Sequence, residues 1–173
     1  MNTLHSRLST GAALLCTGLL AGAFLYGWAN VAATFANVPL DVHLAYRVEL
    51  MKRNGTIMPI LMGLAIVTLA WSTVATRGRT RALITCGAVL ALTALLTTVF
   101  GNVPINGEIK RWAASAPPAG YEDRLDTWAL FHDLRVAAAI GALVLLVVAV
   151  SKRSSPPRGP HAAAGSVSWG GPG

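Results

Sequence analysis

Charged residues are scarce in this sequence: Asp, Glu, Lys and Arg together make up only 12% of its 173 residues. A typical soluble domain contains roughly 25% charged residues. Hydrophobic residues account for 54% of the chain, and the few charges gather in short intervals between apolar runs. This composition argues against a soluble domain with one large core and indicates a single-domain integral membrane protein.

Cysteine is nearly absent as well. The two cysteines, Cys16 and Cys86, lie in different apolar runs and form no CxxC motif, so we expect neither a disulfide framework nor a cysteine-based metal site.

Basic residues outnumber acidic ones by 14 to 7. Because no basic cluster is interleaved with aromatic residues, we expect no binding to nucleic acid.

Four long apolar runs are present, and each supplies the roughly 20 residues that a spanning helix needs. They cover about residues 10–35, 55–75, 82–103 and 128–150. The sequence therefore predicts an all-α fold, a polytopic membrane four-helix bundle over residues 10–151. The first run is longer than the apolar core of a cleaved signal peptide, so we expect it to be a spanning helix. The tail, residues 152–173, is rich in Ser, Pro, Gly and Ala and is expected to be disordered.

Acidic residues are missing from three segments: the N-terminus (residues 1–9), the tight link (residues 76–81) and the tail. Each of these segments carries Lys or Arg. Short basic loops favour the cytoplasmic side of a membrane. We therefore expect a multi-pass protein of the cell (plasma) membrane with both termini cytoplasmic and the two longer loops outside.

A short motif occurs twice, as FANVPLD at residues 35–41 and as FGNVPIN at residues 100–106. The repetition suggests two repeated helical hairpins. Proline disfavours a helical backbone at the residue before it, so Pro39 and Pro104 are expected to end the first and third helices. Two interpretations of the corners remain open. They are simple helix stops, or Asn37 and Asn102 converge on an outward-facing cavity.

The outer loops are predicted to hold short interfacial helices. In DVHLAYRVELMKR, residues 41–53, His43 and Arg47 are four residues apart, and Leu44 begins an apolar stripe. This pattern is typical of an amphipathic helix at the membrane surface. His43 fits a surface residue better than a ligand. Trp112, beyond the second corner, fits either an interfacial anchor or a cavity wall.

Polar residues interrupt the start of the fourth run. Its uninterrupted part, residues 136–150, spans about 22 Å, short of a hydrocarbon core of about 30 Å, so the helix must include His132 and Arg135. Together with Trp128 they are spaced i, i+4 and i+7 and share one helix face. Such residues usually face the protein interior. The alternative places Trp128 and Arg135 at the membrane surface. Asp133 lies on a different face of the helix, and we expect it to pair with a basic residue of an outer loop.

These residues resemble those of a known family. The NVPIN corner and the Trp, His and Arg of the next helix are similar to the anthrone oxygenase-like family of small four-helix integral membrane proteins, long catalogued as a domain of unknown function. The matching residues are Asn102, Pro104, Asn106, Trp112, Trp128, His132 and Arg135. The resemblance covers about residues 8–150. It implies that O₂ oxidises anthrones to anthraquinones without flavin, haem or a classical metal site.

With that resemblance in view, His132 is the candidate base and Arg135 the candidate group that stabilises an enolate or peroxide anion. The candidate substrate-binding residues are Asn102, Asn106, Trp112, Trp128, Asn37 and His43. The expected partners are the lipid bilayer, a small hydrophobic molecule and O₂. A homo-oligomer is compatible with the sequence, and no cofactor is expected.

Other functions remain open at this point. His43 and His132 on the same side favour a haem- or metal-binding membrane protein, although two histidines are few for zinc or copper. The amphipathic loop segment and the basic link favour a non-catalytic membrane binding or interaction module. A small transporter is a weaker alternative, because the first three helices contain no internal acidic residue for proton coupling.

Overall fold

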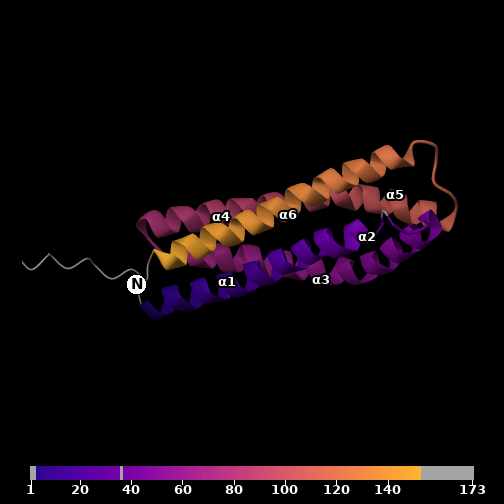
Figure 1. The fold of residues 1–173 in the computed structure, drawn as a ribbon. Helices are drawn as coiled ribbons and strands as arrows, with labels where there is room; N and C mark the ends of the chain where they lie inside the picture. The colour runs from indigo at the N-terminus through magenta and orange to yellow at the C-terminus, as the bar shows by residue number, and fades with distance from the viewer. Residues whose placement is uncertain (1–2, 36, 153–173) are drawn as a thin grey trace, which may run out of the picture.

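The computed structural model describes residues 3–35 and 37–152 of the chain. Within these ranges the chain is helical apart from short connections (Figure 1). The elements are α1 (Thr3–Tyr26), a π-helical turn η1 (Gly27–Ala32), α2 (Ala33–Phe35), α3 (Leu40–Ala75), α4 (Gly78–Thr97), a second π-helical turn η2 (Thr98–Asn102), α5 (Val103–Ala114) and α6 (Tyr121–Ser151). The tail that the sequence predicts to be disordered lies outside the described residues, except for Lys152.

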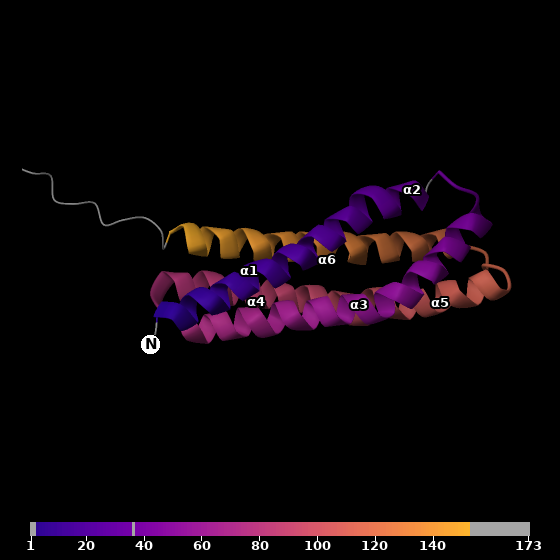
Figure 2. The same ribbon diagram turned by 90° about the horizontal axis from the view of Figure 1, so that it is seen from below.

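The helices run up and down the bundle in chain order (Figures 1 and 2). α1 packs against α3 and α6, and α4 packs against the same two helices. Both described ends of the chain and the link between α3 and α4 lie at one end of the bundle, which we call the terminal end. The connections at residues 37–39 and 115–120 lie at the other, the loop end.

Four helical segments are long and apolar enough to cross a membrane: Leu4–Phe35, Leu40–Ala75, Gly78–Ala114 and Tyr121–Ser151. Large apolar side chains cover the outside of the bundle, and Leu15, Val67 and Val74 are each more than 60% exposed. Such a surface is unfavourable in water and favourable in lipid. The predicted all-α four-helix membrane bundle is therefore confirmed.

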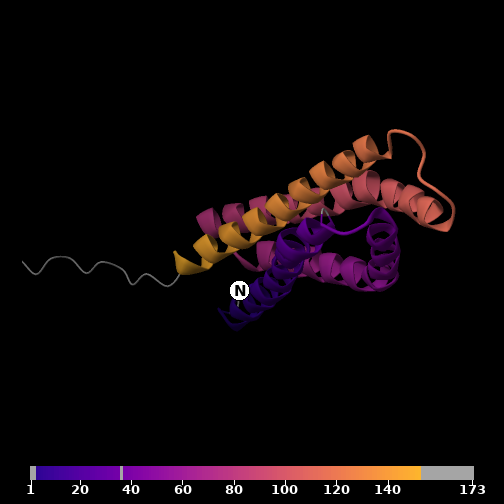
Figure 3. The same cartoon turned by 45° about the vertical axis from the view of Figure 1, so that its right-hand side comes forward.

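Small residues let the helices approach closely, as is usual in bilayers. Many of the fully buried residues are alanines, and Ala65, Ala94 and Ala142 are all 0% exposed. At Gly87 in α4 an added Cβ would lie 3.3 Å from the carbonyl oxygen of Ala142 in α6. Figure 3 shows these two helices side by side along the bundle.

The first NVP corner ends a helix, as the sequence predicts. Helix α2 ends at Phe35, and the backbone N–H of Asn37 donates to the carbonyl oxygen of Thr34 (3.0 Å). Pro39 has φ −54° and ψ 150° and stands at the N-cap of α3. The extended backbone of Pro39 separates the two helices.

The second corner does not end a helix, so the prediction for Pro104 is wrong. The chain stays helical from α4 through η2 into α5. In η2 the backbone N–H of Val103 donates to the carbonyl oxygen of Thr98, five residues earlier. This wider turn makes room for a proline ring that would clash with the preceding turn of a regular α-helix. The two corners therefore differ in structure despite their similar sequences.

The residues predicted to form interfacial helices are helical, but they extend the long helices. Residues 41–53 form the first part of α3. Asn54 and Gly55, which follow them, lower helix propensity but do not end the helix. The first part of α3 is bent relative to the remainder of the same helix (Figure 3). Pro59 lies within this helix, and we attribute the bend to it, because proline removes a backbone hydrogen bond and kinks a helix.

Candidate functional site

Trp128 is the centre of a group of polar and aromatic residues in the loop-end half of the bundle. Its indole Nε1 donates to Oδ1 of Asn106 in α5 (2.8 Å). Its backbone carbonyl oxygen accepts a hydrogen bond from Nδ2 of Asn102 in η2 (2.9 Å). The second corner is thus tied to α6 by two hydrogen bonds to one residue.

Cationic and aromatic groups surround the Trp128 ring. The guanidinium carbon of Arg47 in α3 lies 4.1 Å from the ring centroid, and that of Arg135 lies 5.7 Å away. The imidazole of His132 stacks on the same ring with centroids 4.9 Å apart. Guanidinium groups at these distances are attracted by the indole ring. The structure therefore brings Trp128, His132 and Arg135 together, on the helix face that their spacing indicates.

His132 is buried, with 4% of its surface exposed. Nε of Arg135 donates to Nδ1 of His132 (3.0 Å). Because Nδ1 accepts this bond, a neutral His132 carries its proton on Nε2. Nε2 is buried and has no hydrogen-bond partner among the described residues. Its N–H is therefore a donor available to a ligand.

Arg47 is the member of the site that the sequence analysis missed. Only 6% of its surface is exposed. Its guanidinium lies between two rings, since the guanidinium carbon is 4.7 Å from the centroid of Phe35 and 4.1 Å from that of Trp128. Phe35 also stacks on the imidazole of His43, with centroids 4.5 Å apart. The four-residue spacing from His43 was the available signal, but an amphipathic surface helix explained it equally well.

Asn102 is fully buried, with 0% of its surface exposed. Nδ2 is used by the bond to Trp128, and Oδ1 has no partner in the part of the chain that the structure describes. Buried polar atoms are usually paired. An unpaired acceptor on Asn102 and an unpaired donor on His132 are unusual within one small region, and they suit a ligand that offers both kinds of group.

Asn37 does not join this group. It is exposed, and Nδ2 donates to the carbonyl oxygen of Ala33 (3.2 Å) in its own helical segment. The amide therefore serves the end of α2. Of the two corner asparagines, only Asn102 is buried against α6.

Trp112 lies in an apolar cluster beside the site. It is 8% exposed and is buried with Leu44, Ile105 and Ile109, while Trp128 packs against the same cluster. Its ring also meets Tyr121 edge to face, with centroids 6.3 Å apart. Trp112 is thus part of a packed wall rather than an exposed interfacial anchor.

The charges of the site are not balanced by carboxylates. Within residues 3–35 and 37–152 the ion pairs are Lys52–Glu49 and Arg124–Glu108, and neither includes Arg47 or Arg135.

The prediction of a basic partner for Asp133 is wrong. This exposed carboxylate instead accepts a hydrogen bond from the indole Nε1 of Trp28 in η1 (2.9 Å), because η1 lies beside this part of α6.

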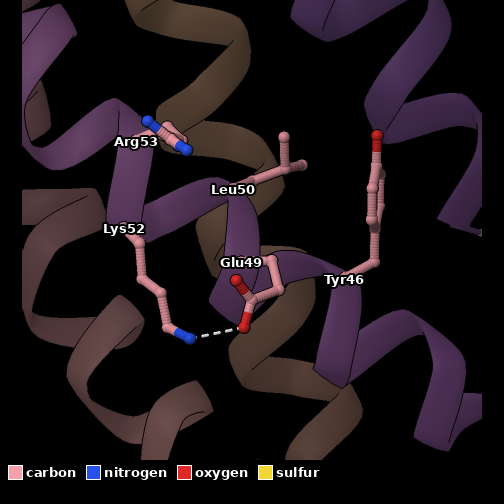
Figure 4. Close-up of a pocket in the computed structure, with 5 residues that line it drawn as sticks. All are labelled: Tyr46, Glu49, Leu50, Lys52 and Arg53. Atoms are coloured by element: carbon pink, nitrogen blue, oxygen red, sulfur yellow. Dashed lines mark hydrogen bonds and ion pairs between the residues drawn. The ribbon is translucent and has the colours of Figure 1, made fainter.

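An open depression lies elsewhere, on the outer side of α3 (Figure 4). It is lined by Tyr46, Glu49, Leu50, Lys52 and Arg53, with the Lys52–Glu49 pair at its edge. None of the buried polar residues around Trp128 contributes to it. In the part of the chain that the structure describes, no group of three or more His, Cys, Asp or Glu residues is arranged to hold a metal ion.

These observations define a four-helix membrane protein with a buried, positively charged aromatic site. Residues 48–145, more than half of the chain, match the family model described as anthrone oxygenase. The chain therefore belongs to the anthrone oxygenase family. No curated protein and no solved structure matches the chain. The matched range includes Asn102, Trp128, His132 and Arg135, and it begins just after Arg47.

Proposed function

We propose that the protein is a cofactor-independent oxygenase that uses O₂ to oxidise a small hydrophobic aromatic ketone or phenol such as an anthrone. The observation that carries the proposal is the pair formed by buried His132 and half-buried Arg135 against the ring of Trp128. This oxidation requires a base, a cation and a flat aromatic surface within one site. The family membership supports the same reaction.

An anthrone carries an acidic CH₂ group between two aromatic rings and opposite a ketone. Removal of one proton gives an electron-rich enolate, which passes an electron to O₂. The resulting radical pair combines to a hydroperoxide, and loss of water leaves the second ketone. The carbon thus loses two hydrogen atoms and gains one oxygen atom, while the other oxygen atom leaves as water.

His132 accepts the CH₂ proton in this proposal. The lone pair of its neutral ring is on Nδ1, where Arg135 donates. Arg135 must therefore turn from His132 to the developing oxyanion as the proton is transferred. The movement places positive charge where negative charge develops, which is the usual source of electrostatic stabilisation in enzymes. Oδ1 of Asn102 is available to accept a hydrogen bond from a phenol of the substrate.

The test is oxygen uptake by the purified protein with a panel of anthrones, with anthraquinone formation followed by absorbance. We expect uptake above the spontaneous rate and its loss in His132→Ala. His5→Ala is the matched control, because His5 is exposed near the terminal end of α1 and should keep full activity. General acid–base groups typically contribute about 10²–10⁴-fold, so the His132 variant should fall to near the spontaneous rate.

Thermal unfolding of both variants separates loss of chemistry from loss of fold. Full activity of a folded His132→Ala protein would contradict the role of the histidine. Absence of uptake by folded wild-type protein across the panel would contradict the oxygenase proposal and favour a binding function for the same site.

A further inference from the structure

Arg47 carries a positive charge that the described structure does not neutralise. Its Nε and Nη1 atoms are buried, and no residue that the structure describes forms a hydrogen bond with them. The charged group that shares the Trp128 ring with it is another cation, Arg135, since the two guanidinium carbons lie 4.1 and 5.7 Å from the ring centroid. Within residues 3–35 and 37–152, no carboxylate forms an ion pair with either arginine. A buried charge is costly unless it is paired and hydrogen-bonded.

The aromatic rings meet this need only in part. Phe35 and Trp128 lie close to the guanidinium of Arg47 and attract its charge. A ring face does not replace a hydrogen-bond acceptor in the plane of the guanidinium, where the N–H groups point. Planar oxyanions such as carboxylates match that arrangement of donors.

We infer that the site binds an organic oxyanion, a carboxylate or an ionised phenol attached to an aromatic ring, through the guanidinium of Arg47. The inference rests on the proposed function for the aromatic part of the ligand and deepens it. Arg135 meets the oxyanion that forms during the reaction, and Arg47 meets a group that is anionic before the reaction begins. Acidic aromatic compounds are then the preferred ligands over neutral ones of the same shape.

The Phe35 ring beside Arg47 lies at the end of a long helical segment. Phe35, which lies against the guanidinium, belongs to the three-residue helix α2, between the π-helical turn η1 and the break at residues 37–39. An oxyanion that hydrogen-bonds Nε and Nη1 approaches in the plane of the guanidinium and needs room beside the Phe35 ring. Movement of this last turn, which directly precedes the break, disturbs less of the bundle than movement of α3 or α6.

The test compares binding of 2-naphthoate with binding of 2-naphthamide to wild-type protein in nanodiscs of zwitterionic lipid, with empty nanodiscs subtracted. The two probes have the same ring system and differ in charge. Neither contains an oxidisable CH₂ group, so binding is measured without turnover. We expect a preference of about tenfold or more for the carboxylate, the scale of one charged hydrogen-bonded contact.

Arg47→Gln should abolish this preference, while Arg53→Gln should retain it. Arg53 is the matched control, because it lies on the same helix but is exposed and outside the site. Arg47→Lys keeps the charge with fewer donors and should retain part of the preference. Equal affinity of the wild-type protein for both probes would overturn the inference, as would an equal loss in the Arg47 and Arg53 variants.

The outcomes remain separate from those of the oxygenase test. A carboxylate preference that depends on Arg47, without oxygen uptake from any anthrone, would retain the anion site and reject the oxygenase. Uptake from neutral anthrones together with equal affinity for the two probes would retain the oxygenase and reject the anion site. If the Arg47→Gln protein does not fold, the wild-type comparison and the Arg47→Lys variant still decide.

Discussion

Trp128 shows how much of the site depends on one side chain. Its indole N–H, its backbone carbonyl and its ring each bind a different neighbour. The neighbours come from α3, η2, α5 and α6, so the ring connects helices that are far apart in the sequence. A residue that would otherwise be interpreted as a membrane-surface anchor is here the point around which the polar groups are arranged.

The two corner asparagines give a prediction about stability. Asn102→Ala should lower the free energy of unfolding by about 1–3 kcal/mol, because it removes a buried hydrogen bond to Trp128 and leaves a small cavity. Asn37→Ala should change it by no more than about 0.5 kcal/mol, because that amide is exposed. Unfolding of both variants in detergent measures the difference. Equal effects would indicate that the corners are equivalent after all.

The sequence allowed part of the site to be predicted at this scale. Residues on one helix face follow from helical periodicity, so Trp128, His132 and Arg135 were found together. Arg47 was missed because its position depends on the path of α3 over the bundle, which no local pattern records. The hydrogen bond between Trp28 and Asp133 joins residues 105 positions apart. Contacts of this kind are set by packing between helices.

The π-helical turn η2 is the element that the sequence could not predict. A proline disfavours a helical backbone at the residue before it and so indicates a helix end by local rules, and those rules hold at Pro39. At Pro104 the helix absorbs the proline by widening one turn, and packing against α6 keeps it helical. Helix number and the approximate position of each apolar run were predictable from composition. The choice between breaking and widening depends on tertiary contacts.

Gly101 tests how tightly this turn packs against α6. A Cβ at this position would lie 2.4 Å from Cγ of Phe131. Gly101→Ala should therefore lower the free energy of unfolding by about 1–3 kcal/mol through overpacking. The matched control is Gly107→Ala in α5, where an added Cβ meets nothing within 4 Å. It should be neutral or stabilising by about 0.5–1 kcal/mol, because alanine favours a helix more than glycine does.

Thermal unfolding of the two glycine variants in the same detergent provides the measurement. A Gly101→Ala protein as stable as the wild type would show that the Phe131 ring moves aside at little cost. In that case the close approach of η2 and α6 would not be what holds the turn in place.

At the scale of the whole molecule, the polar site lies on the loop-end half of α6, whereas the described chain ends lie at the terminal end (Figure 1). Among the described residues, Arg7 near the start of α1 and the arginines of the tight link between α3 and α4 lie at the terminal end. We propose that this end faces the cytoplasm, in accordance with the positive-inside rule. The loop end then faces outward, and a ligand reaches the site from that side or from the outer part of the bilayer.

Cysteine labelling tests this orientation. In a protein with Cys16→Ala and Cys86→Ala, a single cysteine is introduced at Ser115→Cys, which is exposed at the loop end, or at His5→Cys, which is exposed at the terminal end. A membrane-impermeant maleimide should label the first in intact cells and the second only after permeabilisation. The reverse pattern would place the termini outside and the site on the cytoplasmic side.

The separation of the site from the terminal end has a practical consequence for work with the protein. The part of α6 from Trp128 to Ser151 spans about 35 Å at 1.5 Å per residue. A fluorescent protein or a solid support joined beyond Lys152 would therefore lie a bilayer's thickness from the ligand. Such a fusion should leave ligand access undisturbed, and immobilisation through that end would present the loop end to the surrounding solution.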